Sequence, residues 1–255
     1  TNYNNEPLIW ATNLMDQSLQ KAYAPDDFIN LEWLESELIS GSALQGFINH
    51  VDQKLYLYYG FPVDNHDHKF FYIHDPSTGD ITSVKIDHDP IGVVLDEETN
   101  TIYLSNIQNN FINRYDANEN SWMEPINLPE GFLHSYEMFV VNRKLFCTVK
   151  YQNQEQTGTP YILIYDLEEP SVSPVRIQVP GFINYAARIV SHYTVDATGR
   201  VYVSVRVPFS NRGRIIRINN DFGITDCGTN FEDADEILYD QLRWSRLTVQ
   251  YFLQT

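Results

Sequence analysis

Positive charge, cysteine and long apolar runs are all scarce in this sequence. It has 17 Lys and Arg residues against 34 Asp and Glu, which gives a formal net charge of −17. A chain this acidic repels the phosphate backbone of nucleic acids, so we expect no nucleic-acid partner. No run of about 18 apolar residues occurs, and we therefore expect no transmembrane helix and no insertion into a membrane.

The two cysteines, Cys147 and Cys227, are too few and too far apart in sequence for a zinc motif. Whether they pair in an oxidising compartment stays open, because the sequence does not show how closely their Cα atoms approach. Cys147 lies in the apolar stretch LFCTV, which predicts a buried thiol. The acidity, the two cysteines and the start at Thr favour a secreted, extracellular protein, although the sequence has no Asn-X-Ser/Thr glycosylation site.

One pattern recurs four times along the chain: an apolar run, a polar turn, and a second run with alternating apolar residues. The turns carry Asp52, Asp96, Asn142 and Asp196, at spacings of 44, 46 and 54 residues. Alternation with period two is typical of half-buried strands, and Asp or Asn favours hairpin turns. A second hairpin follows each time. Four strands that recur every 40 to 50 residues or so indicate the blade of a β-propeller.

The phrase VDATGRVYVSV, followed by GRIIRI, resembles the units of NHL and SMP-30-like propellers, and most of the chain resembles the β-propeller superfamily. We predict an all-β fold, a single propeller domain over residues 1–255, with five blades and with six as the alternative. The start of the chain looks like a blade without its first strand, and the end, RWSRLTVQYF, looks like that strand. Pairing of the N- and C-terminal strands would close the ring and leave no open sheet edge. The stretch MDQSLQKAYAPDD (15–27) has some helical character.

The starts of the innermost strands are where a propeller is expected to bind a ligand, because they converge on one concave face. Residues of suitable chemistry near these starts are His88, Asp89, His134, Glu137, Arg188 and Trp244. His and Arg would donate hydrogen bonds, the carboxylates would accept them, and Trp would stack. We therefore predict a non-catalytic binding protein whose partner is a small polar molecule, a glycan or another protein.

Two other functions remain open. IDHDPIGVVLDEETNTIYL is similar to a strand of the five-bladed furanosidases, and this resemblance implies a glycosidase with Asp89 and Glu137 as catalytic carboxylates. A lactonase of the SMP-30 type would instead need a divalent metal ion, but that family's metal ligands do not occur at matching places. The third function is that of a structural scaffold. We predict no metal site and no cofactor, with calcium as a minor alternative, because the Asp-rich turns do not match the EF-hand spacing.

Overall fold

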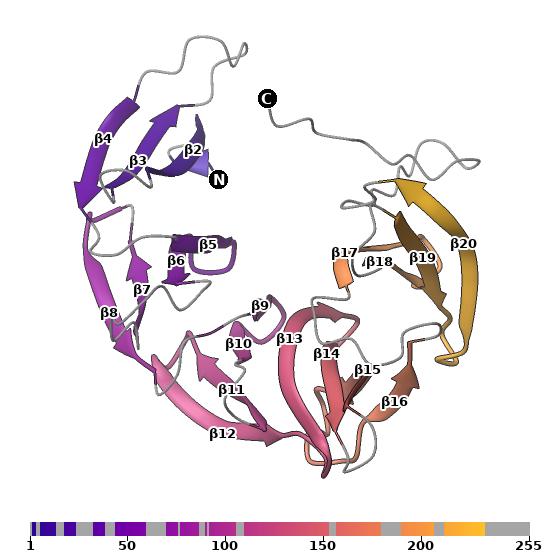
Figure 1. The fold of residues 1–255 in the computed structure, drawn as a ribbon. Coiled ribbons are helices and arrows are strands. Elements are labelled where there is room, and N and C mark those ends of the chain that lie inside the picture. The colour runs from indigo at the N-terminus through magenta and orange to yellow at the C-terminus, as the bar shows by residue number, and fades with distance from the viewer. Residues whose placement is uncertain are drawn as a thin grey trace. The chain divides into compact units, whose positions relative to one another are not determined.

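The structure is a computed structural model in which every regular element among the described residues is a β-strand. It describes residues 2–3, 6–13, 18–23, 33–38, 44–59, 70–75, 77–86, 90, 92–105, 110–152, 157–179, 190–206 and 212–232. The chain divides into two compact units, Thr1–Ile91 and Gly92–Thr255. In both units the strands form four-stranded antiparallel sheets, and strands that follow each other in sequence are neighbours in the sheet (Figure 1).

The first unit contains two of these sheets. One consists of β1 (Asn2–Tyr3), β2 (Glu6–Asn13), β3 (Ser18–Tyr23) and β4 (Trp33–Leu38), and the other of β5 (Leu44–Asn49), β6 (Lys54–Tyr59), β7 (Phe70–His74) and β8 (Ile81–Lys85). Residues 18–23 form strand β3, in agreement with the interpretation of the chain start as strands of a blade, although the stretch 15–27 has some helical character. All six residues of β3 pair with β2, and this tertiary pairing overrides the local helix propensity.

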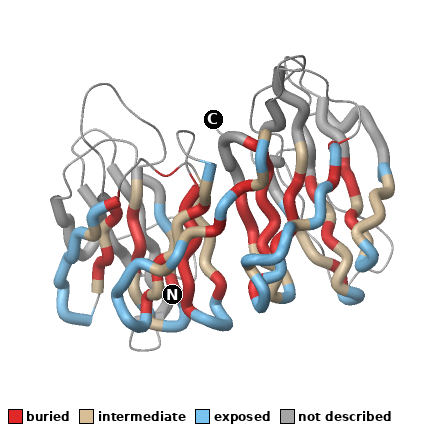
Figure 2. The backbone as a smooth tube through the Cα atoms, turned by 90° about the horizontal axis from the view of Figure 1, so that it is seen from below, coloured by how far each residue is buried: buried red, intermediate tan, exposed pale blue. Residues whose placement is uncertain are grey.

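The second unit contains three sheets. They consist of β9 (Gly92–Asp96), β10 (Thr101–Ser105), β11 (Phe111–Asp116) and β12 (Ser121–Asn127); of β13 (Phe132–Val141), β14 (Lys144–Gln152), β15 (Thr157–Asp166) and β16 (Val175–Gln178); and of β17 (Val190–Val195), β18 (Val201–Arg206), β19 (Arg212–Ile218) and β20 (Ile224–Glu232). In the β9–β12 sheet, the second strand is more deeply buried than the fourth. Every residue of β10 is buried, whereas β12 is mostly exposed. Figure 2 shows buried residues in the middle of the strands and exposed ones at the turns.

The sheet β13–β16 has an apolar core on each of its faces, which follows from the period-two alternation of its strands. On one face Leu145, Cys147 and Leu163 pack with residues of the β9–β12 sheet such as Tyr103. On the other face Phe146 belongs to a cluster that includes residues of the β17–β20 sheet. Full burial of each large apolar side chain stabilises the fold by about 1.5–3 kcal/mol. The prediction of a buried Cys147 is confirmed, and Cys147 and Cys227 are not joined by a disulfide.

The hairpin turns differ more than the repeated sequence pattern suggests. Val141 pairs with Lys144, so Asn142 and Arg143 alone form the turn between β13 and β14. Both have positive φ angles, 48° and 58°, as the two-residue turn that suits the twist of a hairpin requires. The turn after Asp96 holds four residues, because Asp96 pairs with Thr101. The all-β architecture of four-stranded sheets agrees with the sequence prediction of propeller-type blades.

Candidate functional site

The six predicted ligand-binding residues are only partly covered by the structure. His88, Asp89, Arg188 and Trp244 lie outside the described residues. The backbones of His134 and Glu137 belong to β13, but their side chains are not described. The predicted pairing of the two chain ends also falls partly outside, because the described residues end at 232. The place beside β2 that this pairing would use is occupied by β1, through Asn2 and Tyr3.

The first strands of the three sheets in the second unit lie close together. β13 contacts both β9 and β17, so the first strands of three successive sheets are neighbours, as Figure 1 shows. The start of β9 is fixed by Ser105 of β10, which is fully buried. Its Oγ accepts a hydrogen bond from the Gly92 N–H at 3.0 Å and lies 3.3 Å from the Gly92 carbonyl. Gly92, the first residue of β9, is therefore bound to β10 through a buried side chain as well as through the strand ladder.

The strand β13 is irregular at the two residues, His134 and Glu137, that the sequence predicts to bind a ligand. In β13, Leu133 stands opposite Lys150 and Ser135 opposite Val149, so His134 is an extra residue that has no partner in the ladder with β14. A second shift follows between Ser135 and Met138, a stretch that contains Glu137. Such β-bulges turn side chains away from the regular alternation and are over-represented beside active sites.

The strand β17, which is the first strand of the last sheet, shows the same kind of irregularity. In β17, Val190 pairs with Val205 and His192 with Ser204, which leaves Ser191 as the extra residue close to the start of the strand. The β9–β10 ladder, by contrast, is regular over its five residue pairs. Bulges near the strand starts are therefore a shared property of β13 and β17.

An aromatic stack that sequence reasoning missed lies further along the same first strands. Tyr193 of β17 stacks on Phe139 of β13 at 4.2 Å between ring centroids, and Phe139 stacks on Phe146 at 4.8 Å. The Tyr193 side chain is nevertheless 42% exposed. Partial burial raises the pKa of its hydroxyl, and the nearby Glu97 raises it further. An aromatic residue in a strand is ordinary core material, so no sequence signal marks Tyr193 as exposed.

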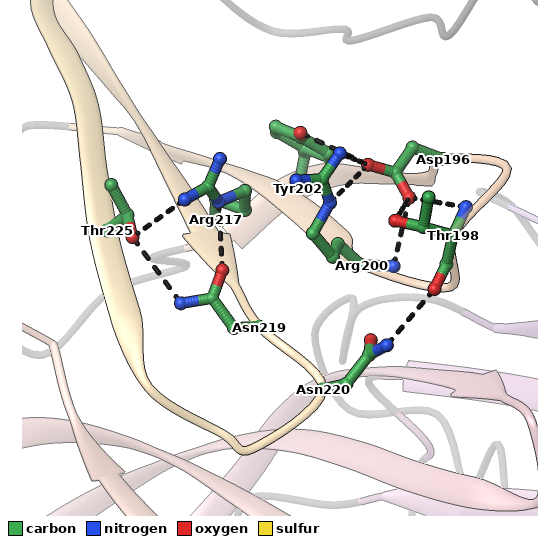
Figure 3. Close-up of polar contacts among 8 residues, drawn as sticks. All are labelled: Asp196, Thr198, Arg200, Tyr202, Arg217, Asn219, Asn220 and Thr225. Carbon is green, nitrogen blue, oxygen red and sulfur yellow. Dashed lines mark hydrogen bonds and ion pairs between the residues drawn. The ribbon is translucent and has the colours of Figure 1, made fainter.

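The Asp residues of the turns are occupied by hydrogen bonds within the turns. Both carboxylate oxygens of Asp196 are engaged, as Figure 3 shows. Its Oδ1 accepts from the Thr198 N–H at 2.8 Å and the Thr198 hydroxyl at 2.6 Å, and its Oδ2 accepts from Arg200 Nε at 2.6 Å. Burial alone would raise the pKa of Asp196, but these hydrogen bonds outweigh it and lower the pKa to about 2. Asp196 is thus a turn residue, as the sequence predicts.

Adjacent sheets of the second unit are also joined through their turns. Asp96, whose side chain is only 4% exposed, forms an ion pair and hydrogen bond with Arg143 of the following sheet. Glu98 lies 3.7 Å from the same guanidinium. The β13–β14 turn and the β17–β18 turn also approach each other closely. A Cβ added to Gly199 in the second of these turns would lie 3.3 Å from Nδ2 of Asn142 in the first. These contacts make the turns a stabilising feature of the fold.

No metal-binding cluster occurs in the part of the chain that the structure describes. Groups of three or more His, Cys, Asp or Glu side chains that could hold an ion are absent there. Over the same residues there is no helical segment with the length and apolar character needed to cross a membrane.

Comparison with known proteins identifies the fold. No family model matches the chain, and no curated protein does. Among solved structures, the chain is similar to hydrazine synthase of Kuenenia stuttgartiensis, at 10% identity and a TM-score of 0.52 over 73% of this chain and 48% of that one. It is also similar to the dihydro-heme d1 dehydrogenase NirN in complex with DHE, at 11% identity and a TM-score of 0.57 over 87% of this chain and 44% of that one.

A third solved structure is a functionally unknown protein from Desulfotomaculum acetoxidans DSM 771, with 12% identity and a TM-score of 0.63 over 89% of this chain and 67% of that one. The chain spans about half the length of hydrazine synthase and NirN, both of which are β-propeller-type proteins. The fold is therefore of the β-propeller type. At this level of identity the likeness shows the fold and leaves the activity open.

Proposed function

We propose that the protein is a binding propeller that recognises a small polar molecule, a glycan or a partner protein where the starts of its first strands converge. In this proposal the wheel has five blades of the NHL or SMP-30 kind. It is closed by pairing of the terminal segments, with residues 243–249 joining the N-terminal sheet. His134 and Glu137 contribute from β13, together with His88, Asp89, Arg188 and Trp244.

The observation that carries the proposal is the pair of bulged first strands. A regular first strand would alternate its side chains strictly between its two faces. The extra residue His134 in β13 and the extra residue Ser191 in β17 break this alternation near the starts of neighbouring strands. Bulges interrupt the backbone ladder, and folds retain them where a side chain has to be directed to a particular place. A recognition site shared by several strands accounts for two such interruptions close together.

NirN supports the proposal that a fold of this type can bind a ligand, because its structure is that of a complex with DHE. The identity of that ligand is not transferred to this chain. The hydrolase alternative needs two carboxylates, Asp89 and Glu137, whose side chains lie outside the described residues. The hydrolase activity stays a prediction. No observation on the described strands favours it over binding.

The experiment is a binding screen followed by substitution. Neutral sugars, sugar acids and defined oligosaccharides are screened by thermal shift, and each binder is titrated by calorimetry. We expect His134→Ala to weaken binding roughly tenfold, as loss of one good hydrogen bond does, with little change in melting temperature. Lys144→Ala at the other end of the hairpin, where Lys144 pairs with exposed Asp166, is the matched control and should leave binding unchanged. Lower stability of His134→Ala with unaltered affinity would give His134 a structural role and contradict the proposal.

A further inference from the structure

A cavity of about 450 Å³ lies between two neighbouring sheets of the second unit, on their outer strands. One wall consists of Arg114 on β11 and residues 124–129 along and after β12. The other wall consists of Tyr165 near the end of β15 and the turn 170–174 before β16. This volume is typical of sites for small molecules. None of the six predicted ligand-binding residues lines the cavity, so it is an additional site.

A bulge in β12 shapes the first wall. Ile112 stands opposite Ile126 and Arg114 opposite Met123, so β12 has one more residue than β11 over this stretch. The bulged stretch contains Glu124 and Pro125. Proline is tolerated there because β12 is the outermost strand of its sheet. Arg114 Nη1 donates to the Glu124 carbonyl at 3.3 Å, which holds the guanidinium at the wall of the cavity.

Arg114 has no counter-ion in the part of the chain that the structure describes. No carboxylate there lies within ion-pair distance of it, although 34 Asp and Glu residues occur in the chain. Its Nε is buried and has no hydrogen-bond partner in the described part of the structure. The guanidinium carbon lies 6.0 Å from the ring centre of Tyr103. Because no described carboxylate offsets this charge, a ligand that brings a carboxylate to the guanidinium group would be bound favourably.

The second wall mixes apolar side chains with two serines and has no acidic side chain. Tyr165 is 1% exposed, and its hydroxyl donates to the Asn127 carbonyl at 3.1 Å, across the gap between the sheets. The turn adds Pro170, Pro174 and Val172, the last of which is 54% exposed. The cavity thus combines the cationic guanidinium group of Arg114 with walls that are partly apolar.

We propose that this cavity binds a small organic carboxylate. The carboxylate oxygens accept hydrogen bonds from the guanidinium group of Arg114, and the apolar body of the ligand lies against Ile126, Leu128 and Val172. Guanidinium and carboxylate groups match in geometry and form paired, charge-assisted hydrogen bonds. Glu124 also lines the cavity, and each further negative charge on a ligand adds repulsion from it, so a monocarboxylate is bound better than a dicarboxylate.

The test uses benzoate as the probe and benzamide as its neutral counterpart of the same shape. Each is titrated into the protein by calorimetry and by two-dimensional NMR. We expect benzoate to bind saturably and benzamide to bind roughly tenfold or more weakly, because only the charged acceptor pairs with Arg114. Arg114→Met should weaken benzoate by a similar factor, and Arg114→Lys should recover part of the affinity. Lys85→Met, which removes an exposed charge on β8, is the control and should bind benzoate normally.

Ser171→Glu provides a second test if Arg114→Met fails to fold. Ser171 is exposed in the turn that lines the cavity, so the substitution leaves the core intact and brings a carboxylate to Arg114. It should abolish benzoate binding and perturb the NMR signals of residues 170–174. Absence of saturable benzoate binding to the wild type would overturn the proposal. So would equal affinity of benzoate for wild type and Arg114→Met, or for wild type and Ser171→Glu.

Discussion

Replacing Asp196 by Asn tests how much the turns contribute to stability. In the folded protein the pKa of Asp196 is lowered from 3.8 to about 2, although burial opposes this shift. Each unit of pKa corresponds to about 1.4 kcal/mol, so the carboxylate form gains about 2 kcal/mol on folding. This is an upper figure, because Arg200 is 38% exposed and water screens its charge. We expect Asp196→Asn to lower the free energy of unfolding by about 1–2 kcal/mol at pH 7.

The pH dependence follows from the direction of the shift. Because the pKa is lower in the folded state, the contribution is complete above the unfolded value of 3.8 and is lost as the pH falls towards 2. Urea denaturation of wild type and Asp196→Asn, followed by circular dichroism from pH 7 to pH 2, measures this directly. The difference between the two proteins should be constant down to about pH 4 and should then narrow.

Asp221→Asn is the matched control for this experiment. Asp221 is exposed in the other hairpin turn of the same sheet and accepts one backbone hydrogen bond, from Gly223 at 2.9 Å. Its substitution should cost less, about 0.5 kcal/mol. The reasoning is refuted if both variants are equally stable at pH 7, or if the effect of Asp196→Asn does not change with pH.

Three further predictions concern stability and reactivity. Arg143→Met should destabilise the protein by about 3 kcal/mol in chemical denaturation, because Asp96 is left buried without its partner; a change below about 1 kcal/mol would make the pair unimportant. Gly199→Ala should cost about 1 kcal/mol, because φ is 81° and the new Cβ crowds the neighbouring turn; an unchanged denaturation midpoint would contradict the geometry. With a thiol reagent, native protein should be modified at exposed Cys227, and at buried Cys147 only after unfolding; labelling of both at equal rates would contradict the packing.

The sheets could be predicted from the sequence because their determinants are local. Alternation with period two and Asp-containing turns are properties of short stretches, and they gave the four-stranded units correctly from Leu44 to Glu232. Ser18–Tyr23 has some local helical character, but it forms a strand of the N-terminal sheet because pairing with β2 decides its conformation. The bulges at His134 and Ser191 could not be predicted, because register depends on which residue of the partner strand stands opposite.

The additional cavity could not be predicted because two sheets build it. Arg114 has one sequence signal: it follows Ile112 by two residues, so by alternation it belongs to the same side of β11 as a side chain that is fully buried. A charged residue at such a position demands a partner. Which side chains surround it depends on the packing of β12 against the turn before β16, and a single sequence does not contain that information.

Hydrogen exchange of residues 243–249 tests the proposed closed wheel most directly. If this segment pairs with the N-terminal sheet, its backbone amides are hydrogen-bonded, and they should exchange as slowly as those of β2. A site shared by all the first strands depends on this closure. Exchange of these amides at the rate of an unstructured chain, while β2 stays protected, would contradict the account.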